Sequence, residues 1–88
     1  MNKQYKLVST NDPNNTEVLE SVTFQDAVEE TLRILQWYII GEGEHFVAVS
    51  NVDPNNIIEL SEPMYEDAQY ELIDIVGYFI SSSTNNED

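Results

Sequence analysis

The most concentrated chemistry in the sequence is a group of carboxylates on one side of a predicted helix near the C-terminus. Glu66, Asp67, Glu71 and Asp74 fall on the solvent side of this helix, together with Tyr70. Asp67, Glu71 and Asp74 follow an i, i+4, i+7 spacing, which places neighbouring acids about 6 Å apart along the helix. That spacing approximates the phosphates along one strand of a nucleic-acid duplex. The same acids on an ordinary solvated helix face would only confer solubility.

A second concentration of oxygen ligands is the segment 11–17. Its spacing suggests calcium, with four candidate ligands: Asp12, Asn14, Thr16 and Glu17. The segment lacks the glycine and the twelfth-position glutamate of an EF-hand loop. A second copy of the segment carries Ile57 and Ile58 in place of the last two ligands. We therefore predict a turn and no metal site, with weak calcium binding as an alternative.

Enzymatic chemistry finds little support in the sequence. The only histidine, His45, begins a predicted strand, and there is no cysteine to act with it. No serine lies in a nucleophile-elbow sequence. The three glycines, at positions 41, 43 and 77, form no phosphate-binding loop. We predict a protein without enzymatic activity, without catalytic residues and without a cofactor.

The charge of the chain is strongly negative and unevenly distributed. The sequence has 17 acidic and three basic residues, for a net charge of −14. Residues 1–40 hold six acids and all three bases, whereas residues 41–88 hold eleven acids and no base. Such a surface repels phosphate backbones and anionic membranes, so we predict no direct binding to nucleic acid and no membrane binding. It attracts a basic surface of a partner protein.

The N-terminal residues 1–5 have no apolar region of the kind found in secretory signals. The longest strongly apolar run, residues 37–40, is too short to span a bilayer. We therefore expect a cytoplasmic protein.

The chain contains an internal duplication. When residues 5–39 are aligned with residues 46–80, 12 of 35 positions are identical without a gap. The identical positions include both copies of Asp-Pro-Asn-Asn, at 12–15 and 53–56. We predict one domain over residues 1–81, made of two repeats, 5–40 and 46–81. Residues 82–88 are predicted to form a disordered acidic tail.

Each repeat is predicted to form a strand, a turn, a second strand and a helix. Asp-Pro-Asn-Asn has the composition of a turn, because Asp suits its first position and Pro presets φ at the next. The predicted strands cover residues 5–9, 17–20, 46–50 and 57–60. The predicted helices cover residues 23–40 and 63–81, with Thr23 and Ser61 as N-cap candidates. We expect Gly41 and Gly43 to end the first helix.

The apolar residues of each predicted helix gather on one face when plotted at 100° per residue. This pattern predicts an α+β fold with two layers, ββαββα, in which a four-stranded antiparallel sheet carries both helices on one face. The predicted core face includes two pairs of equivalent aromatic residues: Phe24 and Tyr65, and Tyr38 and Phe79.

The strands leave several apolar side chains on the face away from the helices: Val8, Val18, Val47, Val49 and Ile57. A solvated sheet face is usually polar, so this face suggests a second layer. We predict a homodimer through the sheet face or through strand edges. A sparsely apolar face without any partner is the alternative.

Trp37 and its repeat equivalent Tyr78 point away from the predicted helical core face. Exposed aromatic residues are enriched at the centres of protein contacts. We predict that the partner surface comprises these two residues and the acidic group of the second helix: Glu66, Asp67, Tyr70, Glu71, Asp74, Trp37 and Tyr78.

We therefore expect a small acidic regulatory module that binds a basic protein surface. The alternatives are an inhibitor that imitates DNA, and a weak calcium-binding protein.

Overall fold

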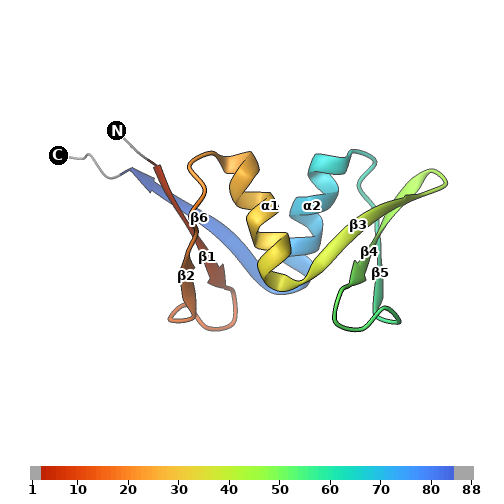
Figure 1. Cartoon of the computed structure of the whole chain (residues 1–88), viewed down its shortest axis with the longest axis horizontal. Helices are drawn as coiled ribbons and strands as arrows, with labels where there is room; N and C mark the ends of the chain where they lie inside the picture. Colours follow the sequence, from red (N-terminus) through yellow and green to blue (C-terminus); the bar gives the residue numbers. More distant parts are fainter. Residues whose placement is uncertain (1–2, 85–88) are drawn as a thin grey trace.

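The computed structural model describes residues 3–84 and has an α+β fold (Figure 1). The described chain forms eight elements in this order: β1 (Lys3–Ser9), β2 (Thr16–Val18), α1 (Phe24–Leu35), β3 (Trp37–Glu42), β4 (His45–Ser50), β5 (Ile57–Leu60), α2 (Tyr65–Ile75) and β6 (Tyr78–Thr84). Each repeat therefore has three strands and one helix, and its last strand follows the helix.

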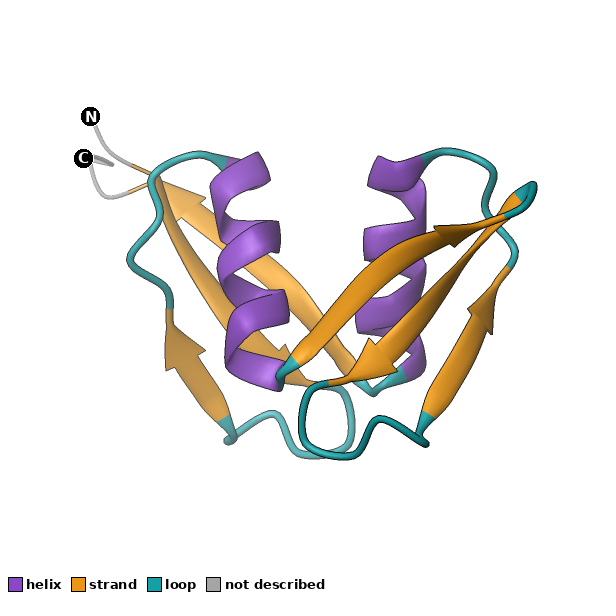
Figure 2. Cartoon of the chain, turned by 45° about the vertical axis from the view of Figure 1, so that its right-hand side comes forward, coloured by secondary structure: helices purple, strands orange, loops and turns teal. Residues whose placement is uncertain are grey.

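The strands form two antiparallel sheets of three, in the orders β2-β1-β6 and β3-β4-β5. The predicted single four-stranded sheet is therefore wrong, although the α+β class is correct. β3 leaves the first repeat and pairs with β4 of the second, while β6 leaves the second repeat and pairs with β1 of the first. The two repeats thus exchange their last strands, and the helices lie side by side between the two sheets (Figure 2).

The helices are shorter than the predicted 23–40 and 63–81, because both end where the exchanged strands begin. The apolar runs after Leu35 and Val76 fit a helix face and a buried strand equally well. Their aromatic and β-branched residues favour a strand. With a period of two, Trp37 and Ile39 face the core, and Tyr38 faces outward. The predicted core position of Tyr38 and of its equivalent Phe79 is wrong, since these side chains are 43% and 47% exposed.

A left-handed residue at equivalent positions reverses the chain after each helix. Gln36 has φ 63°, and Gly77 has φ 93°. Each carbonyl accepts a hydrogen bond from the other repeat: Asn51 N–H donates to Gln36 O at 2.8 Å, and Thr10 N–H donates to Gly77 O at 2.9 Å. These residues end the helices. Gly43, which we expected to end α1, instead lies in the turn between β3 and β4 with φ 64°.

The two Asp-Pro-Asn-Asn segments form the same turn, as the sequence predicts. Asn15 N–H donates to Asp12 O, and Asn56 N–H donates to Asp53 O, both at 2.8 Å. Thr23 caps α1 by accepting a hydrogen bond from Asp26 N–H at 3.2 Å. Ser61 is not the cap of α2, because that helix begins four residues later, at Tyr65, after Met64.

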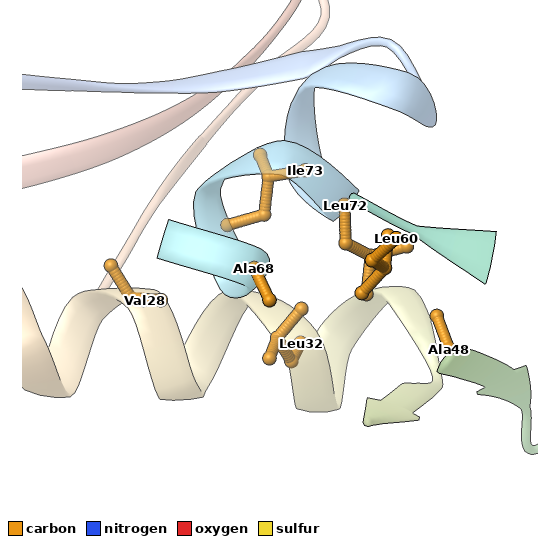
Figure 3. Packing of buried hydrophobic residues seen from close by; sticks show 7 residues of the cluster. All are labelled: Val28, Leu32, Ala48, Leu60, Ala68, Leu72 and Ile73. Atoms are coloured by element: carbon orange, nitrogen blue, oxygen red, sulfur yellow. The ribbon is translucent and has the colours of Figure 1, made fainter. Parts of the chain in front are cut away.

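The core has two clusters, one under each sheet. Four residues, Tyr5, Leu7, Leu19 and Ala27, join α1 to the sheet β2-β1-β6. The larger cluster joins α2 to the sheet β3-β4-β5 and extends to α1 (Figure 3), with these buried members: Val28, Leu32, Ala48, Leu60, Ala68, Leu72 and Ile73. Because α1 contributes to both clusters, the helix pair connects the two sheets.

Val47 and Val49 lie on the outer face of the sheet β3-β4-β5, as predicted, yet both are buried. Their neighbours on adjacent strands cover them, because β4 is the central strand: Tyr38, Ile40, Ile57 and Glu59. Tyr38, Ile40 and Ile57 remain exposed. The predicted tail at 82–88 differs from the structure over 82–84, since β6 continues to Thr84. Residues 85–88 lie outside the described residues.

The left-handed residues provide a matched test of this chain reversal. Replacing Gln36 by glycine removes the steric penalty of φ 63° and should raise the free energy of unfolding by roughly 0.5–1 kcal/mol. Replacing Gly77 by alanine should lower it by more than about 1 kcal/mol, because φ 93° is unfavourable for any residue with a Cβ. Urea denaturation measures both values. Destabilisation by Gln36→Gly would contradict the assigned backbone.

Candidate functional site

The acidic face of α2 is exposed, as the sequence predicts. The buried residues of α2 are Ala68, Gln69, Leu72 and Ile73, and they turn the rest of the helix outward. Glu66, Asp67, Tyr70 and Asp74 are therefore solvent-exposed. A shallow acidic hollow lies on this face, lined by Glu62, Asp67, Tyr70, Glu71 and Asp74.

Glu71 has a structural role within this face. Its carboxylate accepts hydrogen bonds from Ser61 N–H at 2.9 Å, from Ser61 Oγ at 2.9 Å and from Glu62 N–H at 3.1 Å. Partial burial raises the pKa of Glu71, but these hydrogen bonds to the charged form outweigh it and hold the pKa below its ordinary value. Glu71 therefore fixes the loop that leads into α2.

Glu30 makes the same contacts at the equivalent position of α1. Its carboxylate accepts from Glu20 N–H and Ser21 N–H, both at 3.0 Å, and from Ser21 Oγ at 2.7 Å. Burial raises the pKa of Glu30. The hydrogen bonds from Glu20 and Ser21, together with the charge of Arg33, outweigh burial, so the pKa of Glu30 lies below its ordinary value. Since both repeats keep this contact, it belongs to the fold.

A second hollow adjoins the acidic one and is mostly apolar. We call it the aromatic hollow; it has a volume of about 170 Å³ and is lined by Phe24, Tyr70, Ile73, Asp74, Tyr78, Phe79 and Ile80. The rings of Phe24 and Tyr70 are 5.5 Å apart between centroids, with an angle of 48°. Tyr70 and Asp74 line both hollows, so the acidic surface and the aromatic surface are continuous.

Trp37 and Tyr78 do not occupy the exposed helical positions that the sequence predicts. They are the first residues of β3 and β6, where they are half-buried and contact the core cluster around Leu72. The helical projection misplaced them because the helices end before them. Tyr78 lines the aromatic hollow, but Trp37 lines a separate one, so the structure does not bring all seven predicted partner residues together.

The hollow at Trp37 is the repeat equivalent of the aromatic hollow. Its volume is about 390 Å³, and it is lined by Glu29, Leu32, Arg33, Trp37, Tyr38, Ile39, Tyr65 and Gln69. An offset of 41 positions relates seven of these residues to the seven residues of the aromatic hollow. Two positions change chemistry: Asp74 corresponds to Arg33, and Tyr70 corresponds to Glu29. We call this the Arg33 hollow.

Sequence reasoning missed three residues of the candidate surface: Phe24, Phe79 and Glu62. Phe24 and Phe79 were predicted to lie in the core, but Phe24 is 42% exposed at the start of α1. Their repeat equivalents, Tyr65 and Tyr38, are also aromatic. The aromatic ring kept at both pairs of positions could have pointed to these residues. The predicted helices were too long, however, and placed the rings in the core.

The other predicted chemistry is dispersed in the described residues. His45 is exposed at the start of β4. Asp12 uses its carboxylate to accept a hydrogen bond from Asn14 N–H at 3.2 Å. Within residues 3–84, no three acidic, histidine or cysteine side chains are grouped to hold a metal ion. Over the same range, no helix is long and apolar enough to cross a membrane.

Comparisons with protein-family models, with curated proteins and with solved structures found no match to this chain. The fold and the candidate site therefore define it by themselves, as an acidic α+β protein with two strand-exchanged repeats.

The paired loop contacts give a pH-dependent prediction. Because the pKa of Glu71 is lowered in the folded state, its charge stabilises the fold above its ordinary pKa, and this contribution is lost as pH falls through the lowered pKa. Glu71→Gln should lower the free energy of unfolding at neutral pH by about 1 kcal/mol. This value is small for hydrogen bonds to a charged group, because the site is partly exposed to solvent.

The cost of Glu71→Gln should shrink at acidic pH, because the contribution of the charge is lost as the pH falls through the lowered pKa of Glu71. Glu30→Gln should behave in the same way, whereas Glu66→Gln, on the open face of α2, should have little effect at either pH. Urea denaturation at the two pH values measures these differences. A cost that is independent of pH would contradict the assigned role.

Proposed function

We propose that this chain is a non-enzymatic interaction module that binds a basic surface of a partner protein through the exposed face of α2. The observation that carries the proposal is the uncompensated charge of this face. Glu62, Glu66, Asp67 and Asp74 are exposed, and no ion pair joins them to a residue of the range 4–82, over which the structure describes side chains. Acids left without internal partners are available to an external cation.

The first repeat strengthens this assignment because it supplies an internal comparison. The equivalents of Glu66, Tyr70 and Asp74 on α1 are Gln25, Glu29 and Arg33. The α1 face thus carries a base where the α2 face carries an acid. Since the scaffold is the same in both repeats, the concentration of negative charge on α2 is not required by the fold. Complementary charge of this kind raises association rates and makes them salt-dependent.

Charge reversal on the two helices provides the test. Asp67→Lys with Asp74→Lys changes the proposed surface, and Asp26→Lys with Glu29→Lys makes the same change in net charge on α1. Partner proteins are first recovered by affinity purification with the wild-type chain and are then expressed. Their binding to the wild-type chain and to each variant is measured at increasing salt concentrations. We expect the α2 variant to lose binding, the α1 variant to keep it, and affinity to fall with salt. Equal binding by both variants would contradict the proposal.

A second candidate function is the imitation of nucleic acid, for which the spacing of Asp67, Glu71 and Asp74 is the supporting observation. The contacts of Glu71 weaken this candidate, because its carboxylate is turned to the loop at Ser61 instead of standing free in the row. Competition separates the two functions. A partner displaced by duplex DNA or RNA at constant ionic strength favours imitation, and a partner that stays bound favours the interaction module.

We also propose that two copies associate through the outer face of the sheet β3-β4-β5. Tyr38, Ile40 and Ile57 are exposed there beside Val47 and Val49. On the other sheet, the equivalent of Ile57 is the polar Thr16. A second copy would cover the more apolar of the two faces.

Ile57→Lys should therefore shift the chain towards the monomer, whereas Thr16→Lys should not change its association. Sedimentation equilibrium over a concentration series measures both. A wild-type chain that stays monomeric at high micromolar concentration would contradict this association.

A further inference from the structure

We infer that the aromatic hollow receives a single arginine side chain of the protein partner. This inference rests on the proposed function, because it assigns the part of the basic surface that the α2 face recognises. The proposed function describes the α2 face by its charge alone, and the inference adds a specific pocket to that face.

The lining of the hollow fits a guanidinium group. Four of the seven lining residues carry aromatic rings, Phe24, Tyr70, Tyr78 and Phe79, and the other apolar members are Ile73 and Ile80. Cations bind over the faces of aromatic rings, and arginine does so more often than lysine. Phe24 comes from α1, Tyr70 from α2, and Tyr78 and Phe79 from β6, so the rings approach the hollow from three elements.

Asp74 supplies the charge that the rings alone lack. It is the one charged residue of the aromatic hollow, and it also lines the acidic hollow with Asp67 and Glu62. Its carboxylate makes no hydrogen bond or ion pair with any residue of the range 4–82, over which the structure describes side chains. A planar guanidinium can stack on a ring and pair with a carboxylate at the same time, which the compact ammonium of lysine does less well.

The size of the hollow argues for one side chain. Its volume of about 170 Å³ is below the roughly 300–1,000 Å³ of pockets that bind small-molecule ligands. The rings are partly exposed, with Tyr70 at 37% and Phe79 at 47%, so the hollow is open to a side chain that arrives from a protein surface. Burial of these rings around the arginine would add apolar area to the contact.

The Arg33 hollow provides the comparison that makes the inference specific. It keeps rings at three equivalent positions, Tyr65, Trp37 and Tyr38, but replaces Asp74 by Arg33 and the ring of Tyr70 by Glu29. Its own cation opposes entry of a second one at that position. We therefore expect arginine at the aromatic hollow only, although both hollows share one scaffold.

The test is a titration with N-acetyl-arginine methylamide, followed by NMR of the isoleucine and leucine methyl groups. We expect saturable shifts at Ile73 and Ile80, and none at Leu32 and Ile39 of the Arg33 hollow. The lysine analogue should bind more weakly. The citrulline analogue has nearly the same shape without the charge and should give no shift. Equal shifts with citrulline, or stronger shifts with lysine, would overturn the inference.

Two variants of the hollow test its parts. Asp74→Asn keeps the shape and removes the charge, and Tyr70→Leu removes one ring. Each should weaken binding of the arginine probe by about three- to tenfold. Glu44→Gln, in the exposed turn between β3 and β4 and outside every hollow, is the control for the removal of one charge and should bind as the wild-type chain does. If Asp74→Asn and Glu44→Gln bind equally well, the assignment of Asp74 is wrong.

Transfer of the site gives a positive test. Glu29→Tyr with Arg33→Asp gives the Arg33 hollow the two groups that distinguish the aromatic hollow. The chain has one tryptophan, and Trp37 lines the Arg33 hollow, so its fluorescence should respond to the arginine probe in this double variant but not in the wild-type chain. Absence of a response in a folded double variant would overturn the claim that these two positions determine binding.

A short lysine-rich peptide separates failure of this inference from failure of the proposed function. The backbone amides of Glu66 and Asp67 report on the acidic face of α2. If the peptide shifts these amides but the arginine probe leaves Ile73 and Ile80 unchanged, the inference fails and the proposed function stands. If neither probe causes any shift, both fail.

Discussion

The exchange of the last strands depends on one constraint: the chain must reverse immediately after each helix. Gln36 and Gly77 achieve this by adopting positive φ, and their carbonyls then accept hydrogen bonds from Asn51 and Thr10 of the other repeat. Each reversal therefore joins the end of one helix to the first strand of the opposite repeat. Without it, β3 and β6 could not cross, and each sheet would lose its third strand. The aromatic hollow depends on the same crossing, because β6 brings Tyr78 and Phe79 to a place where Phe24 of α1 and Tyr70 of α2 already lie.

Local features were predictable from the sequence, and the exchange was not. The turns at Asp12 and Asp53, the cap at Thr23 and the exposed acids of α2 follow from residue types over a few positions.

The end of α1 gave no such signal, because glutamine rarely adopts the left-handed conformation and the apolar run after it suits either a helix or a strand. The error at the end of α1 placed Trp37 and Tyr38 on the wrong faces, and the equivalent error at the end of α2 misplaced Phe79. Strand partners lie far apart in the sequence, so the pattern of one strand cannot identify its neighbour. The acidic part of the candidate site was thus predicted, whereas the adjoining hollow required the fold.

The duplication separates what the fold requires from what each repeat has changed. Glu30 and Glu71 hold equivalent loops, so their conservation between repeats has a structural cause. Among the buried helix residues the repeats differ: Val28 corresponds to Gln69, and Thr31 corresponds to Leu72, and all four residues are fully buried. The polar atoms of Thr31 and Gln69 have no partner among the described residues. Two identical chains around a two-fold axis would place like residues at equivalent positions. Joining the repeats in one chain removes that restriction, so a polar residue in one repeat can correspond to an apolar residue in the other.

The same freedom allows the two repeats of a chain of net charge −14 to present different surfaces. Diffuse negative charge attracts any basic protein, and it governs the rate of encounter more than the choice of partner. Selection requires short-range contacts that reward one side chain over another. In the first repeat, the position of Asp74 is occupied by Arg33 and the position of Tyr70 by Glu29, so the rings there lie beside a cation. In the second repeat, the rings lie beside a carboxylate that has no partner in the described residues. Under the proposed function, two substitutions on a shared scaffold would be sufficient to turn one of two related hollows into a site for a cation, and the surrounding acids would direct basic partners towards it.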